Sequence, residues 1–448
     1  MKYINDTIVA NASALTTQAI SIIRVSGAST YQLVNQVFSK DILQQKGYTL
    51  VNGYIQNLNG EKIDEVVLAC YRNPKSFTGE DVIEINCHGG VLVTQKIIKL
   101  LLSLGMRMAQ PGEFTRRAFL NNKLNLVQAE AINDLIFAEN DATLKTAINS
   151  LGKHTTNLIN QLSEQLLTLI ANVNVNIDYP EYDGVKEVTN TAMLNDVTAF
   201  LQVIKKIKEH SQITQIIKNG IDTVIIGKPN VGKSSLLNAF LKEDKAIVSE
   251  IQGTTRDLVE GKINLGDISL NLIDTAGIRA TTDKIEKIGI AKSKLMIDKA
   301  QLVILVLDGS KQLTKEDHDL MKLIKDKNYI IAINKSDLGL KLQITDAVNI
   351  SALNQNITSL IEIIKAKALT TKIDFNNELL LTNTRQLEYF DQIETNISKA
   401  VEELKIGVPV DLVVIYLQNA WNLLLSIQGK DHQINLIDEI FKRFCLGK

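Results

Sequence analysis

The sequence predicts a multidomain protein that combines an N-terminal α+β domain, a helical domain and an inserted α/β domain with a mostly parallel sheet. Three observations predict this. Short β-branched runs alternate with helical patterns over residues 1–118, and apolar residues recur at helical spacing over residues 119–219. From 220 to 370 buried-strand patterns alternate with helices, which is typical of a parallel sheet covered by helices. Helical spacing then returns over residues 371–448.

Length and composition agree with this division. At about 100–200 residues per domain, 448 residues suffice for two to four domains. Lys+Arg 49 against Asp+Glu 50 leaves a net charge of -1, so any RNA contact is expected to be local or shared with a partner. No apolar run reaches the ~18 residues of a membrane span, and the N-terminus lacks the apolar region of a signal peptide. The cysteines Cys70, Cys87 and Cys445 are too few and too scattered for a disulfide framework or a zinc cluster. We therefore expect a cytoplasmic protein that has no membrane contact.

The elements of the first domain follow from its β-branched runs. Runs at 8–10, 19–23, 65–69 and 82–85 predict strands, and the pattern at 91–102 predicts a helix. The sequence therefore predicts a small α+β domain.

The helical segments come before and after the α/β segment. A break at 178–184, where Pro and Gly interrupt the pattern, separates predicted helices in the first of them. Helices on both sides of the α/β segment have apolar faces that would cover each other, so the simplest topology is one helical domain with an insertion. Two separate helical bundles would give the same pattern.

A phosphate-binding loop follows the strand pattern at 223–226. The residues are Gly227-Lys228-Pro229-Asn230-Val231-Gly232-Lys233-Ser234, and a helix-forming run begins at Ser235. This is G-x-x-x-x-G-K-[ST] between a strand and a helix, a context that disfavours a chance turn. Backbone N–H groups and the helix start can hold the β-phosphate, Lys233 can bridge the β- and γ-phosphates, and the Ser234 hydroxyl can coordinate Mg²⁺.

Motifs at later strand ends identify the nucleotide. Asp274-Thr275-Ala276-Gly277 places a carboxylate near Mg²⁺ and a glycine near the γ-phosphate. In Asn334-Lys335-Ser336-Asp337, the carboxylate of Asp337 can accept both the ring N–H and the exocyclic amine of guanine, an arrangement that adenine cannot offer. Ser351-Ala352, after a third strand, can support the guanine carbonyl. The order of these motifs favours GTP over ATP.

A threonine between the first two motifs is a candidate metal ligand. Thr255 lies in Gly253-Thr254-Thr255-Arg256-Asp257 and is the candidate second hydroxyl ligand of Mg²⁺ in a switch loop. The alternative is a polar turn before a hairpin. The hairpin itself is predicted over 261–265 and 268–273.

The group that positions the attacking water is less obvious. Ile278 follows the Asp-Thr-Ala-Gly motif where many GTPases carry a water-orienting glutamine, and an alkyl side chain cannot polarise water. Asp283 and Glu286 are the acidic candidates downstream, although each could equally be a solvated charge. Arg256 and Arg279 are near enough in sequence to be considered as arginine fingers.

The ordered motifs resemble those of the MnmE (TrmE) family of tRNA-modification GTPases. The C-terminal Phe444-Cys445-Leu446-Gly447-Lys448 is similar to the family's Cys-x-Gly-Lys, and three N-terminal stretches, at 76–81, 87–90 and 111–124, resemble further family motifs. The resemblance covers nearly the whole chain. It implies a folate-binding and dimerisation domain over 1–118, a helical domain over 119–219 and 371–448, and a G domain inserted at 220–370.

For the G domain, the resemblance implies a homodimer whose G domains meet across a potassium ion in the transition state. A cation beside the phosphates would neutralise developing charge as an arginine finger does. By resemblance its ligands are Asn230, Ser249, Ile251 and Thr254, and Glu286 falls where the family's water-orienting glutamate lies, so the catalytic residues are Glu286, Lys233 and Thr255. The full set expected to bind GTP is Asn230, Val231, Gly232, Lys233, Ser234, Ser235, Ser249, Thr254, Thr255, Asp274, Thr275, Ala276, Gly277, Asn334, Lys335, Asp337, Ser351 and Ala352.

For the N-terminal domain, the resemblance implies a site for a one-carbon donor, 5-formyltetrahydrofolate. The matching positions are Arg24, Glu84, Lys123 and Lys448, and their chemistry fits: a carboxylate can accept N–H groups of a pterin edge, and basic side chains can meet carboxylates. The family's early Pro-Pro-Gly and Gly-rich stretch is replaced here by residues 13–18. Cys445 invites interpretation as a functional thiol, but a small buried thiol is the commoner case.

The implied function is that of an enzyme subunit. With the flavoprotein MnmG, in a heterotetramer or larger assembly, it would build the aminomethyl or carboxymethylaminomethyl group at C5 of the wobble uridine, U34, of certain tRNAs. The alternative is a regulatory GTPase of ribosome assembly, which shares the nucleotide motifs. Such a protein should carry an RNA-binding appendage such as a KH domain or a basic tail, and the C-terminal region offers neither.

Overall fold

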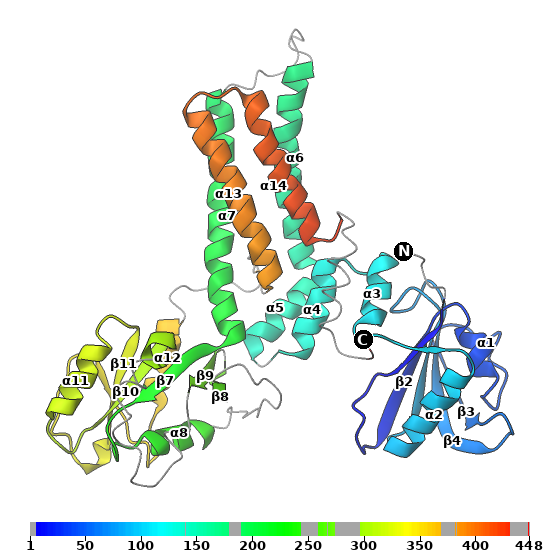
Figure 1. The fold of residues 1–448 in the computed structure, drawn as a ribbon, viewed down its shortest axis with the longest axis horizontal. Coiled ribbons are helices and arrows are strands. Elements are labelled where there is room, and N and C mark those ends of the chain that lie inside the picture. Colours follow the sequence, from blue (N-terminus) through cyan, green and yellow to red (C-terminus); the bar gives the residue numbers. More distant parts are fainter. Residues whose placement is uncertain are drawn as a thin grey trace. The chain divides into compact units, whose positions relative to one another are not determined.

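A computed structural model describes residues 6–138, 140–178, 190–242, 259–266, 268–273, 296–368, 381, 383–430 and 447. The chain forms two compact units, Met1–Asn133 with Leu424–Lys448, and Asp134–Leu423. Figure 1 labels the elements of both units. The expected domain boundaries at 118, 219 and 370 stay predictions.

The first unit contains a mixed sheet of six strands in the order β3-β4-β5-β2-β1-β6. β1 and β6 pair in parallel, and the other neighbours pair antiparallel. The strands are β1 Ile8–Asn11, β2 Ile20–Ser26, β3 Thr49–Gln56, β4 Lys62–Tyr71, β5 Val82–His88 and β6 Arg107–Met108. The sequence predicted β1, β2, β4 and β5. It missed β6, which has only two residues, and β3, because this edge strand contains Asn52 and Gly53 and leaves Leu50 72% exposed, so it lacks a continuous apolar face.

Two helices cover one face of this sheet, and a third packs on the other face at β1. The helices are α1 Thr30–Asn35, α2 Val91–Ser103 and α3 Glu113–Leu120. Val9 packs in one core with residues of α1 and α2, whereas its neighbours Ile8 and Ala10 pack with Phe114 of α3. This alternation follows from the two-residue side-chain period of a strand. The predicted α+β arrangement is confirmed.

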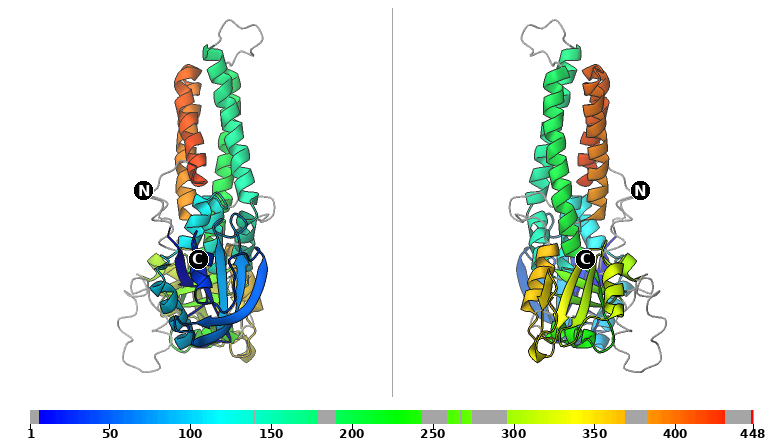
Figure 2. Two further views of the ribbon diagram at one scale, coloured as in Figure 1. Left: turned by 90° about the vertical axis from the view of Figure 1, so that its right-hand side faces the viewer. Right: turned by 90° about the vertical axis from the view of Figure 1, so that its left-hand side faces the viewer.

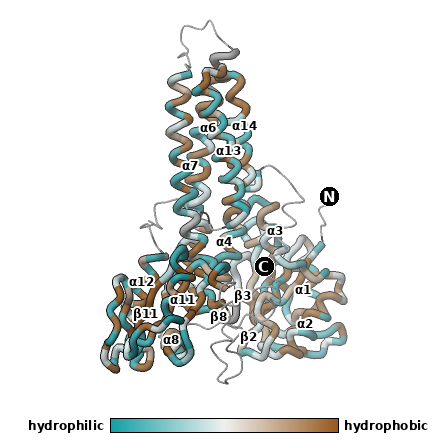
Figure 3. The backbone as a smooth tube through the Cα atoms, turned by 60° about the vertical axis from the view of Figure 1, so that its left-hand side comes forward, coloured by the Kyte–Doolittle hydropathy of each residue, from teal (hydrophilic) through white to brown (hydrophobic). Residues whose placement is uncertain are grey.

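The second unit includes long helices from both ends of its sequence. The helical elements are α4 Leu126–Ile136, which crosses from the first unit into the second, α5 Asp141–Leu151, α6 His154–Asp178, α7 Asn190–Asn219, α13 Thr384–Lys405 and α14 Val410–Ile427, whose residues from Leu424 on belong to the first unit. Figure 2 shows α6, α7, α13 and α14 side by side, and Figure 3 shows hydrophilic and hydrophobic residues alternating along them. Lys208 of α7 forms ion pairs with Asp391, at 2.6 Å, and with Glu394, both of α13. Helices that flank the α/β segment in sequence therefore pack against each other, as expected for an insertion.

Helix α14 is also long and apolar enough, by length and composition alone, to cross a membrane. Its 18-residue window has a mean hydropathy of 1.4, although the sequence analysis had not singled it out. A core helix of a helical domain passes the same test, and Val413, Leu417 and Ala420 on α14 are fully buried in the protein.

The α/β part of the second unit contains a sheet in the order β12-β11-β10-β7-β9-β8. Only the β8–β9 pair is antiparallel among the described pairings, and it forms the predicted hairpin. The strands are β7 Ile221–Ile226, β8 Val259–Asn264, β9 Ser269–Ile273, β10 Leu302–Asp308, β11 Tyr329–Asn334 and β12 Ala347–Asn349. Residues of α8 Lys233–Lys242 and α12 Thr358–Ala368 pack on one face, and residues of α11 Lys315–Leu323 pack on the other. The mostly parallel, doubly covered sheet predicted from the sequence is confirmed.

Candidate nucleotide and folate sites

The phosphate-binding loop lies between β7 and α8, at the carboxyl end of the parallel strands. Gly227 has φ +151°, and a Cβ there would lie 2.4 Å from the carbonyl oxygen of Val306 in β10. Gly232 has φ +102°, and a Cβ there would lie 2.1 Å from Nδ2 of Asn334. Both positions therefore require glycine, because only glycine lets the loop backbone approach the neighbouring strands this closely. Asn230, between them, also has a positive φ of 61° and is exposed.

Lys233 is the first residue of α8, and its side chain turns back over the loop. Its Nζ donates to the carbonyl oxygens of Gly227, at 2.6 Å, and Lys228, at 2.7 Å. No carboxylate of the described residues forms an ion pair with it, and burial lowers the pKa of Lys233 below its ordinary value. An anion bound here would favour the charged ammonium. Ser234, the next residue, is exposed at the start of the helix, where a hydroxyl can reach a metal ion.

Asn334, the last residue of β11, connects the two ends of the site. Its Nδ2 donates to the carbonyl oxygen of Val231, at 2.9 Å, and its Oδ1 accepts from the N–H of Ala352, at 3.0 Å. The residue is 2% exposed, so both of its bonds are shielded from water. Asn334 thus holds the phosphate loop and the Ser351-Ala352 loop in a fixed relation.

The predicted base-recognition carboxylate is presented to solvent. Asp337 is exposed, and its Oδ1 accepts a hydrogen bond of 2.5 Å from Oγ of Ser351. Ser351 is buried, so it orients the carboxylate from the protein side. Lys335, which has φ 64°, donates from Nζ to Oδ2 of Asp308 at 2.7 Å. The structure therefore brings the phosphate loop, the Asn-Lys-Ser-Asp motif and the Ser351-Ala352 loop together, and their roles in binding GTP stay predictions.

In the first unit, Arg24 and Glu84 face each other. They are paired in register on β2 and β5, and Nη2 of Arg24 lies 2.8 Å from Oε1 of Glu84. Nη1 of Arg24 also donates to the carbonyl oxygen of Gly447, at 3.2 Å, and the guanidinium lies 5.6 Å from the ring centre of Phe114. Lys123 instead donates to the carbonyl oxygen of Pro74, at 3.0 Å. Arg24 and Glu84 thus share one partly buried cluster with Gly447, and no described contact joins Lys123 to it.

Comparisons with known proteins agree with this geometry. The family model described as MnmE helical domain matches residues 126–445, and the model described as GTP-binding protein TrmE N-terminus matches residues 7–123. The chain belongs to the MnmE (TrmE) family of tRNA modification GTPases. With the nucleotide site above, membership of this family makes it an enzyme of the GTPase class.

Curated relatives cover nearly the whole chain. The tRNA modification GTPase MnmE of Acholeplasma laidlawii is 45% identical, with 99% of each chain covered. The protein of the same name from Mycoplasma mycoides subsp. mycoides is 43% identical, with 99% of this chain and 100% of that one covered. Among solved structures, Aquifex aeolicus Era bound to GDP.AlF4- is 26% identical over 39% of this chain and 66% of its own, with a TM-score of 0.26.

Several site residues predicted from the motifs or from the MnmE resemblance lie outside the described residues, and their roles stay predictions. In the G domain these are Ser249, Ile251, Thr254, Thr255, Asp274, Thr275, Ala276, Gly277 and Glu286. At the C-terminus they are Cys445 and Lys448.

Two groups of residues were missed by the sequence analysis. Lys228 of the phosphate loop forms an ion pair of 2.6 Å with Asp317 in the first turn of α11. In the first unit, Arg107 and Arg117 share the carboxylates of Asp6 and Glu113 at distances of 2.6 to 3.1 Å. Arg117 also reaches Glu80 at 3.1 Å. Only the four-residue spacing of Glu113 and Arg117 on α3 was a usable local signal, because Arg107 lies outside that helix and the remaining partners are far apart in sequence.

Proposed function

We propose that the chain is the GTP-hydrolysing subunit that acts with the flavoprotein MnmG to build the aminomethyl or carboxymethylaminomethyl group at C5 of U34 in certain tRNAs. One observation carries this proposal: Asn334 joins a phosphate loop to a guanine-recognition loop in a chain that aligns over 99% of its length with tRNA modification GTPases. The near-neutral net charge of -1 fits an enzyme that shares tRNA recognition with a partner.

In this proposal the described residues bind both the phosphates and the guanine base of GTP. The Lys233 ammonium leaves its two carbonyl acceptors for the β- and γ-phosphate oxygens, and the Asp337 carboxylate accepts the N–H donors of guanine. Ser234 and Thr255 are proposed to hold Mg²⁺, which would neutralise phosphate charge. Ser234 is exposed at the start of α8, so its hydroxyl can reach an ion bound with the phosphates.

Hydrolysis is proposed to need a water-orienting carboxylate and a potassium ion. Glu286 is the proposed carboxylate, and Asn230 with Ser249, Ile251 and Thr254 are the proposed cation ligands at an interface between two G domains. We expect Glu286→Ala to leave GTP affinity within about 3-fold and to slow hydrolysis by about 100-fold or more, since positioned acid–base groups contribute about 10²–10⁴-fold. Stopped-flow binding and single-turnover hydrolysis check both values, and unchanged turnover would refute the role.

The potassium role has its own test. Replacing K⁺ by Na⁺ at constant ionic strength should lower both the hydrolysis rate and the dimerisation of the G domains, because Na⁺ is smaller than the site proposed for K⁺. Analytical ultracentrifugation with a transition-state analogue measures dimerisation. Equal rates and equal dimerisation in the two salts would count against the cation site.

The N-terminal cluster is proposed to bind 5-formyltetrahydrofolate through Arg24, Glu84, Lys123 and Lys448. The structure fits a ligand with N–H donors and carboxylates here. Arg24 and Glu84 are partly buried, Nη1 of Arg24 donates to the carbonyl oxygen of Gly447, and a Cβ on Gly447 would lie 2.4 Å from the backbone carbonyl oxygen of Asn11. Gly447 therefore lies close to the Arg24–Glu84 pair, and a bound folate would supply the one-carbon unit. We further propose that the chain is a cytoplasmic homodimer.

The decisive experiment for the function is nucleoside analysis of tRNA. A strain lacking this gene should lose the C5 modification of U34, and the wild-type gene should restore it. The matched variant is Lys233→Met, which should fail to restore it. Normal U34 modification in the deletion strain would overturn the proposal and favour a role such as ribosome assembly.

A further inference from the structure

The last turn of α7 meets the sheet of the G domain at strand β9. α7 ends at Asn219, and Gly220 separates it from β7. Nδ2 of Asn271, in β9, donates to the carbonyl oxygen of Asn219 at 2.9 Å and to Oδ1 of Asp222 at 3.0 Å. One β9 side chain therefore holds both the end of the helix and the start of the central strand.

Gly220 makes this close approach possible. It has φ +83°, and a Cβ there would lie 2.7 Å from Oδ1 of Asn271 and 3.1 Å from the carbonyl oxygen of Ser269. Its N–H donates to the carbonyl oxygen of Ile216 at 2.9 Å, which closes the last turn of the helix. A side chain at position 220 would be strained at this positive φ and would displace the Asn271 amide, so the contact favours glycine.

The same turn is also bound to α4. Nζ of Lys218 lies 2.6 Å from Oδ1 of Asp134, and the side chains are 24% and 11% exposed. Asp134 belongs to α4, the helix through which the chain passes from the N-terminal unit into the second unit. The turn 218–220 therefore bonds to two elements: a strand of the G domain and the helix that leads to the N-terminal domain.

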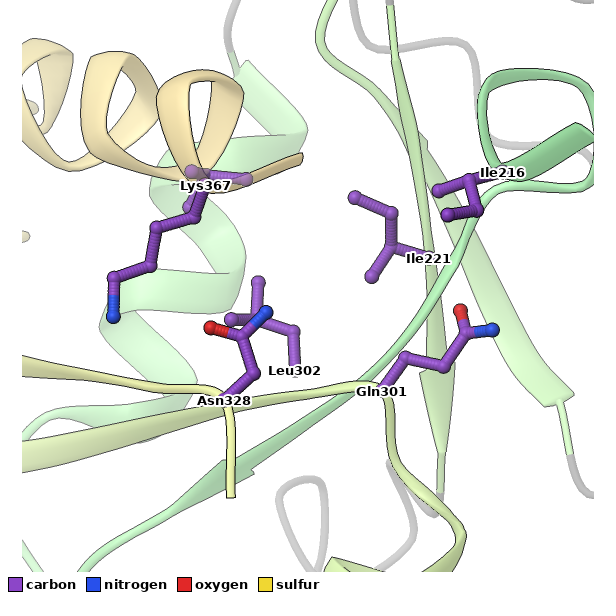
Figure 4. Close-up of a pocket in the computed structure, with 7 residues that line it drawn as sticks. Ile216, Ile221, Gln301, Leu302, Asn328 and Lys367 are labelled. Carbon is purple, nitrogen blue, oxygen red and sulfur yellow. The ribbon is translucent and has the colours of Figure 1, made fainter. Parts of the chain in front are cut away.

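A cavity lies on another side of this turn. It has a volume of about 180 Å³ and is lined by Ile216 of α7, Ile221 of β7 and Leu302 of β10, with the side-chain amides of Gln301 and Asn328. Figure 4 shows these side chains around it. The pocket is open to solvent, so this side of the helix end is not close-packed against protein.

We propose that residues 218–220 form a joint that couples the nucleotide state of the G domain to α4, with Asn271 and Lys218 as positioning residues. β9 ends at Ile273, and the next residue is Asp274, the first residue of the Asp-Thr-Ala-Gly motif. A change in that motif acts on β9, Asn271 transfers it to the end of α7, and Lys218 transfers it to Asp134. The inference rests on the proposed function, since it takes the γ-phosphate to act on this motif.

The test measures α4 and GTP hydrolysis separately in the full-length protein. Hydrogen exchange of residues 126–136 is compared in GDP and in a non-hydrolysable GTP analogue. The wild type should show a nucleotide-dependent change in exchange rate of about 5- to 150-fold, the range of typical coupling between sites. Asn271→Asp is nearly isosteric but cannot donate to Asn219, so it should reduce this change to less than about 2-fold while kcat and KM stay within about 2-fold. Asn349→Ala, an exposed asparagine at the end of β12, is the matched control and should keep the full response.

A double variant that swaps the two side chains distinguishes a loss of coupling to α4 from a loss of local stability. Asn271→Asp combined with Asp222→Asn restores a donor and an acceptor between these two positions but not the bond to Asn219. It should recover the melting temperature and remain uncoupled, and a restored α4 response would overturn the role of the α7 bond. If Asn271→Asp does not fold, the ion pair supplies the test: Lys218→Asp alone should uncouple α4, and Lys218→Asp with Asp134→Lys should recouple it.

The outcomes distinguish this inference from the proposed function. A protein that hydrolyses GTP but whose α4 exchange is the same in both nucleotides overturns the joint and leaves the proposed function intact. A full α4 response in Asn271→Asp also overturns the joint. A protein that neither binds nor hydrolyses GTP overturns the proposed function instead.

Discussion

Two charged regions of this chain differ in whether their basic side chains have carboxylate partners. In the N-terminal unit, Arg117 is 9% exposed and meets the carboxylates of Asp6, Glu80 and Glu113. In the G domain, Lys233 is half-buried, and among the described residues it meets only two carbonyl oxygens. A buried charge with complete internal partners stabilises a fold, whereas a buried charge without a counter-ion marks the place where an anionic ligand binds.

Glu113→Gln should disrupt the charge network around Arg107 and Arg117 and should cause the largest loss of stability. It keeps the size of the side chain but removes a charge shared by Arg107 and Arg117, and breaking a buried pair costs about 3–5 kcal/mol. Urea denaturation should show this loss in the free energy of unfolding of the N-terminal unit, with GTP affinity unchanged. Glu61→Gln, at an exposed turn, is the control. An equal small loss in both variants would show that the network is not structural.

The pH dependence of the free energy of unfolding gives a second test of the same network. Burial alone would raise the pKa of Glu113, but hydrogen bonds from Arg107, the N–H of Gln110 and Arg117 hold that pKa below its ordinary value of 4.5. A carboxyl whose pKa is lower in the folded state contributes stability above its unfolded pKa and loses it as the pH falls through the folded value. The stability difference between wild type and Glu113→Gln should therefore be full at pH 7 and shrink below about pH 4.5. A difference independent of pH would contradict the ionic account.

Lys233→Met should have the complementary effect. GTP affinity should fall by about 10- to 100-fold, because a hydrogen bond to a charged group contributes about 1.5–3 kcal/mol. The melting temperature without nucleotide should stay the same or rise, since the variant removes a buried ammonium that has no counter-ion. Titration calorimetry and thermal denaturation measure the two effects, and a marked loss of stability would mean that Lys233 is structural.

Asp317→Asn should have the smallest effect. It tests, inside the G domain, whether an internally paired charge stabilises the fold. Asp317 is 3% exposed, pairs with Lys228 and accepts from the N–H and the hydroxyl of Thr314 in a capping box. Like Glu113 it is an internally paired charge, but it pairs with one lysine instead of two arginines, so we expect a smaller loss of about 1 kcal/mol of stability, the usual value of a helix cap. GTP affinity should stay within about 3-fold. A large loss of affinity with no loss of stability would show that proximity to the phosphate loop outweighs internal pairing.

The sequence alone predicted the features that depend on residues close together in the chain. The strand, glycine loop and helix around residues 223–234 have a spacing that fixes their structure, and the parallel strand order brings Asn334 and Ala352 to the same edge. It was insufficient for contacts between distant residues. Arg117 pairs with Asp6 across 111 positions, and Asn271 bonds to Asn219 across 52, and neither pair has a local pattern that identifies its partner.

The central claim is that the phosphate loop, Asp337 and the Ser351-Ala352 loop form one guanine-specific triphosphate site. The most direct measurement is a calorimetric titration of the full-length protein with GTP and with ATP, in Mg²⁺ and K⁺. The account predicts that GTP binds at least about 100-fold more tightly than ATP, since two charge-assisted hydrogen bonds of about 1.5–3 kcal/mol each distinguish the bases. It also predicts that Asp337→Asn removes most of this preference. Equal affinities for GTP and ATP, or a preference unchanged in Asp337→Asn, would contradict it.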